Sequence, residues 1–245
     1  MTQALAGLLS APPNFVVANE AVELSGFKGV CCRCRFETTQ YTDALFCHYQ
    51  DAVPVALLNS TKVRKAEFLA GRIAARHAFI QLGITPQAIP IARHRQPLWP
   101  AMVLASISHH ADSAFCMMMP TPSPKPLISI GIDVESIVHA EDRALLSPSI
   151  ASRKELDTMT ANFLDNEYGF TVVFSAKEAL FKALYPAVGR YFDFLDVEIS
   201  AINISKCELE MRLLIDLSAQ LLRGHTVTVR WKKEANTVIS WVLPY

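Results

Sequence analysis

Hydrophobic and polar residues alternate along much of this chain, and the alternation predicts mostly short β-strands with a few helices between them. In the first half, the segments that are predicted as strands, by alternation or as short apolar runs, are residues 28–37, 44–49, 88–93, 102–108 and 114–119. A polar turn at 110–113 joins the last two, which predicts a hairpin. A helix is expected from an N-cap at Asn59 or Ser60 to Leu82, where Gly83 ends it. The first ~25 residues show little pattern.

Alternating prolines between residues 120 and 126 divide the chain. Proline fits neither a helix interior nor a central strand, so we expect an extended connector there, with one domain over 1–124 and a second over 125–245. In the second domain the expected helices are 149–162 and 175–185, the latter ended by Pro186, and the expected strands are 127–135, 195–200, 207–214, 226–231 and 237–243. Both halves combine helices with mainly antiparallel strands, so the predicted fold class is α+β.

Composition and charge exclude several classes of protein. Hydrophobic residues make up 51% and charged residues 19%, which is typical of a compact globular chain and not of a disordered one. Lys and Arg together number 23, and so do Asp and Glu together, so the net charge is zero. A net charge of zero indicates neither nucleic acid nor an anionic membrane as a partner. No run of ~18 apolar residues and no basic region near the start is found, so we expect a cytoplasmic protein without a transmembrane helix or signal peptide.

The cysteines lack the CxxC spacing of a zinc site. Cys31, Cys32 and Cys34 are too crowded for a standard zinc knuckle, which favours free buried thiols in a reducing cytosol. We therefore do not include the cysteines in the candidate site.

Two acidic segments carry the strongest chemical signal. Asp133 and Glu135 end the strand that begins at residue 127, and residues i and i+2 of a strand share a face. Glu178 and Lys182 lie one turn apart at the start of a helix. Three carboxylates and an ammonium group that converge suit Mg²⁺ bound to a phosphate-bearing substrate. The structural alternatives are a solvent-facing acidic strand edge, an S-x-x-E capping box and an ordinary i,i+4 ion pair.

Basic and polar residues of the first half form a second group of candidates. Arg72 and Arg76 share a helical face, and Arg64 lies two turns upstream of Arg72. Guanidinium forks suit phosphate, although a solvated basic face is the common alternative. Gly71 is costly in a helix interior, which suggests a close approach by backbone or ligand. His109 ends the sequence Ser-Ile-Ser-His at a polar turn, where function often resides, although an isolated histidine is usually structural.

These motifs follow one another in a fixed order. They are R-x-x-E-F-x-A-G-R from Arg64, P-x-W-P from Pro97, S-I-S-H from Ser106, G-I-D-V-E from Gly131 and F-S-x-K-E-x-x-F-K-A-L-Y-P from Phe174. Over roughly residues 64–196 this order resembles the 4′-phosphopantetheinyl transferases, most closely their monomeric, double-length branch with the enterobactin- and surfactin-synthetase enzymes. Five motifs in order make the match specific.

The resemblance implies an activity and a fold. Family members move the phosphopantetheine arm of coenzyme A onto a serine of an apo carrier protein and release adenosine 3′,5′-bisphosphate. The implied fold has two similar α+β halves related by a pseudo-twofold, with the active site in the cleft between them. A monomer is implied as well.

The resemblance also implies roles for the acidic group. Asp133, Glu135 and Glu178 match the family's Mg²⁺ ligands, and the choice between Mg²⁺ and Mn²⁺ stays open. Glu178 also matches the base that deprotonates the carrier serine. Lys182 matches the lysine that contacts the pyrophosphate and assists the leaving group. These roles agree with general acid–base and metal-ion catalysis.

The first half would bind coenzyme A. The residues that match positions beside its phosphates and nucleotide are Arg64, Arg72, Ser108 and His109. Relatives often carry glycine where this chain has Ala101 and Ala105, and a basic residue where it has Gln96. Arg95 or Arg93 would substitute for the basic residue.

Two other functions use the same residues. One is a Mg²⁺-dependent phosphodiesterase that cleaves coenzyme A with water, and the other is a non-catalytic module that binds coenzyme A or a carrier protein. Loss of an acid or of Lys182 would favour the binding module, and all of them are present. The residues do not say whether the carrier serves fatty-acid, polyketide or peptide synthesis.

Overall fold

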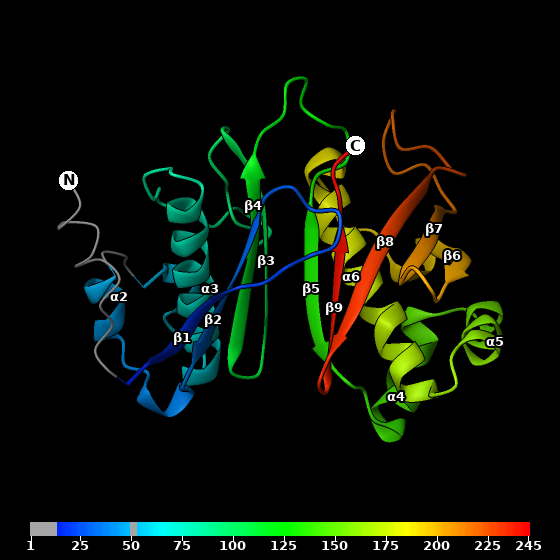
Figure 1. Cartoon of the computed structure of the whole chain (residues 1–245), viewed down its shortest axis with the longest axis horizontal. Helices are drawn as coiled ribbons and strands as arrows, with labels where there is room; N and C mark the ends of the chain where they lie inside the picture. Colours follow the sequence, from blue (N-terminus) through cyan, green and yellow to red (C-terminus); the bar gives the residue numbers. More distant parts are fainter. Residues whose placement is uncertain (1–13, 50–52) are drawn as a thin grey trace. The chain divides into compact units, whose positions relative to one another are not determined.

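The computed structural model describes residues 14–49 and 53–245, and Figure 1 shows their helices and strands. Backbone contacts divide the chain into two compact units, Met1–Thr121 and Pro122–Tyr245. In the described part of each unit, a long helix packs against an antiparallel sheet. The predicted α+β class is therefore confirmed, whereas the pseudo-twofold and the cleft stay predictions.

The described part of the first unit forms a sheet with the spatial order β1-β2-β4-β3. Its strands are β1 (Val16–Ala21), β2 (Val30–Phe36), β3 (Val103–His110) and β4 (Ser113–Pro120), and its helices are α2 (Ala44–His48) and α3 (Lys62–Gln81). Helix α3 begins because Thr61 Oγ1 accepts a hydrogen bond from the Arg64 amide. It ends before Gly83, whose φ of +70° is easily adopted only by glycine. Its buried face packs against β2, β3 and β4.

The second unit forms a sheet with the spatial order β5-β9-β8-β7-β6 in the described residues. Its strands are β5 (Gly131–Ser136), β6 (Val197–Asn203), β7 (Glu208–Leu213), β8 (Thr226–Glu234) and β9 (Thr237–Val242). Between β5 and β6 lie α4 (Ala140–Ile150), α5 (Arg153–Asn162) and α6 (Asn166–Val188). Short 3₁₀ turns occur in the first unit at Thr38–Gln40 and Val55–Leu57, and in the second unit at Phe194–Asp196. Helix α6 packs on β5, β8 and β9 (Figure 1).

Helix α6 runs along β5 and is hydrogen-bonded to that segment at three levels. The contacts are the Ser129 amide to the Ala183 carbonyl (3.2 Å), Lys182 Nζ to the Ile132 carbonyl (3.1 Å), and the Val138 amide to Thr171 Oγ1 (2.9 Å). Higher numbers on the strand thus pair with lower numbers on the helix. The strand segment 133–135 therefore lies level with the helix between Thr171 and Lys182, which is where Glu178 is found.

Gly131 allows this close approach of strand and helix. A Cβ atom there would lie 2.0 Å from the carbonyl oxygen of Ala179 and 2.8 Å from the amide nitrogen of Ala183. Glycine is thus required because no side chain fits at this position. Alternate residues of a strand share a face, so residues 133 and 135 also face the helix.

Two predicted strands of the first unit are wrong. Of the predicted strand 44–49, residues 44–48 form the helix α2, and residues 88–93 contribute only an isolated bridge between Ile91 and Pro97 in the described structure. Both are short apolar runs, in which periodicity does not distinguish a strand from a helix or an extended loop. Conversely, β1 lies where the sequence predicts no element.

The predicted helix 175–185 is one part of α6, which starts at Asn166 and continues past Pro186. Ser175 lies inside this helix, so the alternative of a capping box between Ser175 and Glu178 is wrong. The preceding run 170–174 is rich in aromatic and β-branched residues, which are poor helix formers. It is helical because its side chains pack into the core.

The predicted helix 149–162 is divided between α4 and α5, which begins at Arg153. A capping box causes this break. Ser152 Oγ accepts from the Glu155 amide, and the Glu155 carboxylate accepts from the Ser152 amide at 2.9 Å.

All cysteines are free thiols, and the four buried ones are Cys31, Cys32, Cys34 and Cys116. Cys47, in contrast, is exposed and Cys207 is half-buried, so burial does not hold for every thiol. Burial raises the pKa of Cys32 to about 11 and that of Cys34 to about 12, which keeps both protonated at neutral pH. Within residues 14–49 and 53–245, no helix is long and apolar enough to cross a membrane. The expectation of no signal peptide concerns residues 1–13, which lie outside the described residues.

Candidate active site

The acidic residues of the predicted site lie on β5 and α6 of the second unit. Asp133 and Glu135 share the sheet face of Gly131, which is turned towards α6. Only 3% of the surface of Asp133 is exposed, and Glu135 is half-buried. Although β5 is an edge strand of its sheet, the alternative of a solvent-facing acidic edge is wrong for Asp133.

Lys182 connects the helix to the strand at this point. Its Nζ donates to Asp133 Oδ1 at 2.7 Å and to the Ile132 carbonyl at 3.1 Å. The Lys182 side chain is 26% exposed, whereas that of Asp133 is only 4% exposed. The ion pair therefore has a buried acid and a base that reaches solvent.

Glu178 lies among these charges. Burial is the largest cause that raises the pKa of Glu178, the Lys182 charge lowers it, and the charges of Asp133 and Glu135 raise it further. Glu178 is thus within electrostatic range of the other three groups. Three of the four are acidic and one is basic, so the group carries excess negative charge when it is fully ionised. We call these four residues the acidic cluster.

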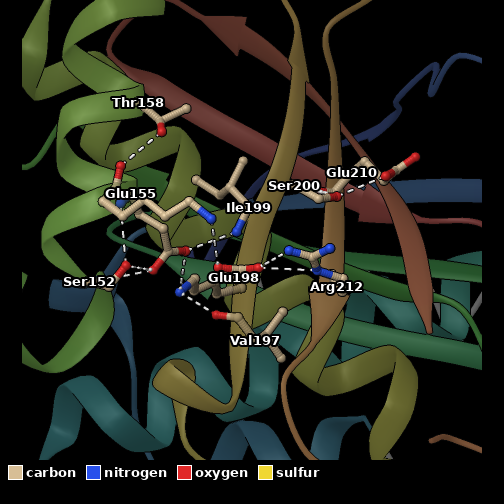
Figure 2. A network of polar contacts seen from close by, with 11 residues as sticks. Ser152, Glu155, Thr158, Val197, Glu198, Ile199, Ser200, Glu210 and Arg212 are labelled. Carbon is tan, nitrogen blue, oxygen red and sulfur yellow. Dashed lines mark hydrogen bonds and ion pairs between the residues drawn. The ribbon is translucent and has the colours of Figure 1, made fainter. Parts of the chain in front are cut away.

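The residue before Glu178 belongs to a different network, part of which Figure 2 shows. Lys177 is 1% exposed, and its Nζ lies 2.8 Å from the carboxylate of Glu155, which is 2% exposed. That carboxylate accepts hydrogen bonds from Ser152 and from the Ile199 amide (Figure 2). Lys177 Nζ also donates to the carbonyls of Ile150, Phe194 and Val197. This network fixes the helix that carries Glu178 to α5 and β6.

In the first unit, Arg64, Glu67 and His109 form a contact group. Arg64 Nη1 lies 2.6 Å from His109 Nε2, and each of these two side chains lies 3.5 Å from the Glu67 carboxylate. A guanidinium group only donates hydrogen bonds, so Nε2 accepts and we assign the ring proton to Nδ1, on the side of Glu67. His109 is neutral in this arrangement.

Arg72 is buried, with 7% of its surface exposed. Its guanidinium carbon lies 4.4 Å from the ring centroid of Phe68, a cation–π geometry. Both residues line a cavity of about 390 Å³, together with residues 54–56 and 88–92. The alternative of a solvated basic face is therefore wrong for Arg72, whereas the Arg64 side chain is 46% exposed.

The two faces of β3 separate Ser108 from His109. A Cβ on Gly71 of α3 would lie 3.1 Å from Ile107 Cγ2, so Ile107 faces this helix, and His109 shares its face. Ser108 is buried and lies on the opposite face. The close approach predicted at Gly71 is made by a side chain of the sheet. The side chains of Ser108 and His109 thus project from opposite faces of β3.

Arg95 lies in a turn next to Ala92, one of the residues that line the cavity of Arg72. It is exposed, its φ is +66°, and its amide donates to the Ala92 carbonyl in a tight turn.

Comparisons with known proteins agree with this architecture. A family model described as the 4′-phosphopantetheinyl transferase N-terminal domain matches residues 53–119, and one described as the 4′-phosphopantetheinyl transferase superfamily matches residues 129–238. The chain is 34% identical over 187 residues to Enterobactin synthase component D of Salmonella typhi, covering 76% of this chain and 74% of that protein. The chain belongs to the 4′-phosphopantetheinyl transferase superfamily. It is an enzyme that transfers the phosphopantetheine group of coenzyme A to a carrier protein.

Other members of the superfamily are similar to this chain over shorter alignments. Enterobactin synthase component D of Escherichia coli (strain K12) is 35% identical over 148 residues, which cover 60% of this chain and 66% of that protein. The 4′-phosphopantetheinyl transferase Npt of Nocardia iowensis is 30% identical over 169 residues, which cover 67% of this chain and 70% of that protein. The similarity thus extends from enterobactin synthase component D to a relative named as a 4′-phosphopantetheinyl transferase.

Within the described residues of this transferase, no three His, Cys, Asp or Glu side chains are arranged so that they could enclose a metal ion. In the acidic cluster, the Lys182 ammonium group instead lies against Asp133. The three carboxylates of the acidic cluster nevertheless lie on β5 and α6, and hydrogen bonds join α6 to β5 and to the residues on either side of it.

Two contact residues of the transferase, Glu67 and Phe68, belong to the motif that begins at Arg64, but the sequence alone assigns them no contact. Glu67 lies three residues after Arg64, and Phe68 lies four residues before Arg72, and both are spacings at which helical side chains meet. That spacing was the available signal for Glu67 and Phe68. No such signal links Lys177 to Glu155, because the two are brought together only by the packing of α5 on α6.

Proposed function

We propose that this transferase is Mg²⁺-dependent and that its chemistry takes place at the acidic cluster. The observation that carries the proposal is the position of three carboxylates and one ammonium group on β5 and α6. The contacts at Ser129, Ile132 and Val138 hold these two elements together. When the three acids and the one base are ionised, they carry a net negative charge that a divalent cation would balance.

Asp133, Glu135 and Glu178 would hold the cation. Oxygen ligands from one or two carboxylates, with substrate phosphates and water, are what Mg²⁺ prefers, so the donor set fits it, and Mn²⁺ takes the same ligands. When bound, the cation would neutralise charge on the pyrophosphate of coenzyme A. The burial of Asp133 makes it the more strongly fixed of the two strand carboxylates.

Glu178 would remove the proton from the carrier serine. Burial raises its pKa above the ordinary range of a glutamate, and a carboxylate with a higher pKa is a stronger base. Lys182 would place positive charge on the leaving phosphate, since its ammonium group is partly exposed and is oriented by Asp133. Asp133 thus serves both the cation and the orientation of Lys182.

The first unit would bind the nucleotide end of coenzyme A. Arg64 and His109 form a hydrogen-bonded pair that is accessible enough to contact a phosphate. Arg72 would bind from the wall of the cavity that it shares with Phe68. Arg95, which is exposed, would replace the basic residue missing at Gln96, and Ser108 stays a candidate on the other face of β3. We accordingly assign coenzyme A binding to 1–124 and the acid–base chemistry to 125–245.

The relatives suggest which carriers to test first. Because two of them are named Enterobactin synthase component D, we propose a carrier domain of a siderophore peptide synthetase as the substrate. We further propose a cytoplasmic monomer that binds neither nucleic acid nor membrane, in agreement with equal numbers of acidic and basic residues. Light scattering after size exclusion would report the monomer or a larger assembly.

Intact-protein mass spectrometry tests the proposed function. An apo carrier protein is incubated with this chain, coenzyme A and Mg²⁺, beside parallel samples that contain EDTA or the Glu178→Gln variant. We expect one added phosphopantetheine on the carrier serine, abolished by EDTA and strongly reduced by the substitution.

Two results would contradict the proposal. If transfer is unchanged in EDTA, the reaction does not require a divalent cation. Coenzyme A that is hydrolysed while several unrelated apo carriers gain no mass would support the phosphodiesterase instead.

A further inference from the structure

One stripe of helix α6 faces the β5 segment along its length. Thr171, Ser175, Glu178 and Lys182 are spaced by four, three and four residues, which places them on one side of a helix. Thr171 contacts the Val138 amide and Lys182 contacts Asp133, so both ends of this stripe touch the strand segment. Ser175 therefore faces the same segment, one turn before Glu178.

The hydroxyl group of Ser175 is fully buried and has no hydrogen-bond partner within the described residues. Helical serines usually donate to the carbonyl four residues earlier or reach solvent, and Ser175 does neither. Burying a hydroxyl without a partner costs roughly 1–3 kcal/mol. A serine retained at such a position requires an explanation.

Ser240 of β9 presents a second hydroxyl of the same kind. It is the Cα partner of Asp133 in the antiparallel β5–β9 pair, and directly opposite residues project from the same face of a sheet. The Cβ atoms of such pairs are about 4.5–5.5 Å apart. Ser240 is 0% exposed, and Oγ has no hydrogen-bond partner in the part of the chain that the structure describes.

The two serines thus come from different elements and lie beside the same carboxylates. Ser240 lies next to Asp133, and Ser175 lies one turn from Glu178 on the face turned to β5. Buried polar groups nearly always have a partner, and a water molecule or an ion is one explanation of an unpaired group. Mg²⁺ keeps several of its water ligands when it binds to protein carboxylates.

We propose that Ser175 and Ser240 are positioning residues whose hydroxyl groups hydrogen-bond water molecules coordinated to the divalent cation of the acidic cluster. The proposal rests on the proposed function, because it takes the cation to bind Asp133, Glu135 and Glu178. The two hydroxyls orient the hydration shell and thereby fix the cation relative to the carboxylates. Such outer contacts typically change metal affinity by about 10- to 100-fold.

A packing role predicts a different result. If each serine only fills a small space, alanine fits as well, and loss of the unpaired hydroxyl leaves cation affinity unchanged while stability stays the same or rises. If each hydroxyl binds a coordinated water, alanine weakens cation binding. In both cases the fold is kept, because an unpaired hydroxyl contributes no hydrogen bond to it.

The test measures Mn²⁺ binding to the full chain by the electron paramagnetic resonance signal of free Mn²⁺. The variants are Ser175→Ala, Ser240→Ala and, as matched control, Ser129→Ala, whose buried serine precedes β5 outside the acidic cluster. We expect the dissociation constant to rise about 10- to 100-fold for the first two and to stay unchanged for the control. Melting temperatures are expected to stay at or above that of the wild type.

If the Mn²⁺ dissociation constants of both serine variants are within twofold of the wild-type value, the inference is wrong. The proposed cation site at the acidic cluster is not affected by that result. The Asp133→Asn variant separates this failure from failure of the proposed function. If the wild type binds no Mn²⁺, or if Asp133→Asn binds it as well as the wild type, the cation site itself is wrong and the inference falls with it.

Discussion

Helix α6 carries two lysines that each bind a carboxylate and backbone carbonyls, and their surroundings differ. Lys177 is 1% exposed and lies against Glu155, with three carbonyls completing its contacts. Lys182 is 26% exposed and lies against Asp133. Lys177 thus belongs to the core, whereas Lys182 stands at the border of core and solvent.

The balance of charges around the two lysines differs as well. The Glu155 carboxylate is satisfied by Lys177, Ser152 and the Ile199 amide. Asp193 and Glu198 also lie within electrostatic range of Lys177, but Lys154 and Arg212 bind Glu198, so that three acids meet three bases. Around Lys182 one base meets three acids, and burial with two neighbouring carboxylates raises the pKa of Glu178 against the effect of Lys182. A closed, balanced network holds the fold, while an unbalanced one beside solvent is suited to bind a further charge.

The largest expected effect is on transfer, in the Glu178→Gln variant. Removing a general base lowers the rate about 10²- to 10⁴-fold. The amide keeps the size of the side chain, so the melting temperature should change little. Single-turnover transfer to an apo carrier measures the rate. A rate within threefold of the wild type would show that Glu178 is not the base and would weaken the contrast between the two networks.

The next largest effect is on stability, in the Lys177→Met variant. It leaves the buried Glu155 charge without its partner, which costs about 3–5 kcal/mol of unfolding free energy. Urea unfolding would report this loss, and Glu155→Gln should lose stability by the same route. The Lys177→Met, Glu155→Leu double variant should recover part of it. An unchanged denaturation midpoint in Lys177→Met would contradict the scaffold role.

A smaller effect is expected in Lys182→Met, the same substitution five residues along the helix. Loss of a cation at the leaving phosphate lowers the transfer rate about 10²- to 10³-fold. Stability should fall by about 1–3 kcal/mol, less than for Lys177→Met, because Lys182 is partly exposed. Lys182→Arg keeps the charge and serves as control. If Lys182→Met transferred at the wild-type rate per folded molecule, the two lysines would both be structural.

The smallest effect is on the pH dependence of stability without divalent cations. Because the pKa of Glu178 is raised in the folded state, the folded chain binds this proton more tightly than the unfolded chain. Stability therefore falls as pH rises from the ordinary to the raised pKa. Glu178→Gln should match the wild type below this window and exceed it above. Urea unfolding at several pH values measures both, and parallel profiles would contradict the raised pKa.

Sequence patterns predict the α+β class and most of the strands because alternation reports a half-buried sheet directly. Asp133 and Glu135 share a face as their spacing requires. The full length of α6 is not predictable from its residues, since the run 170–174 favours a strand locally and is helical only through its packing. Tertiary context here overrides local preference.

The residues of the site are easier to predict from the sequence than the contacts between them. Glu178 and Lys182 are predictable as neighbours on a helix, but the contact of Lys182 with Asp133 depends on the close approach at Gly131. The Lys177–Glu155 network, part of which Figure 2 shows, joins residues from separate helices and gives no local signal. Only the packing of the second unit distinguishes the role of Lys177 from that of Glu178.

The most direct test of the acidic cluster is the titration of the Glu178 carboxyl carbon by ¹³C NMR, with and without Mg²⁺. Comparison with the spectrum of Glu178→Gln assigns the signal. The account predicts a pKa above the ordinary glutamate range without Mg²⁺, because of burial and the neighbouring acids, and a clear decrease when Mg²⁺ is added. An ordinary pKa that does not respond to Mg²⁺ would contradict it.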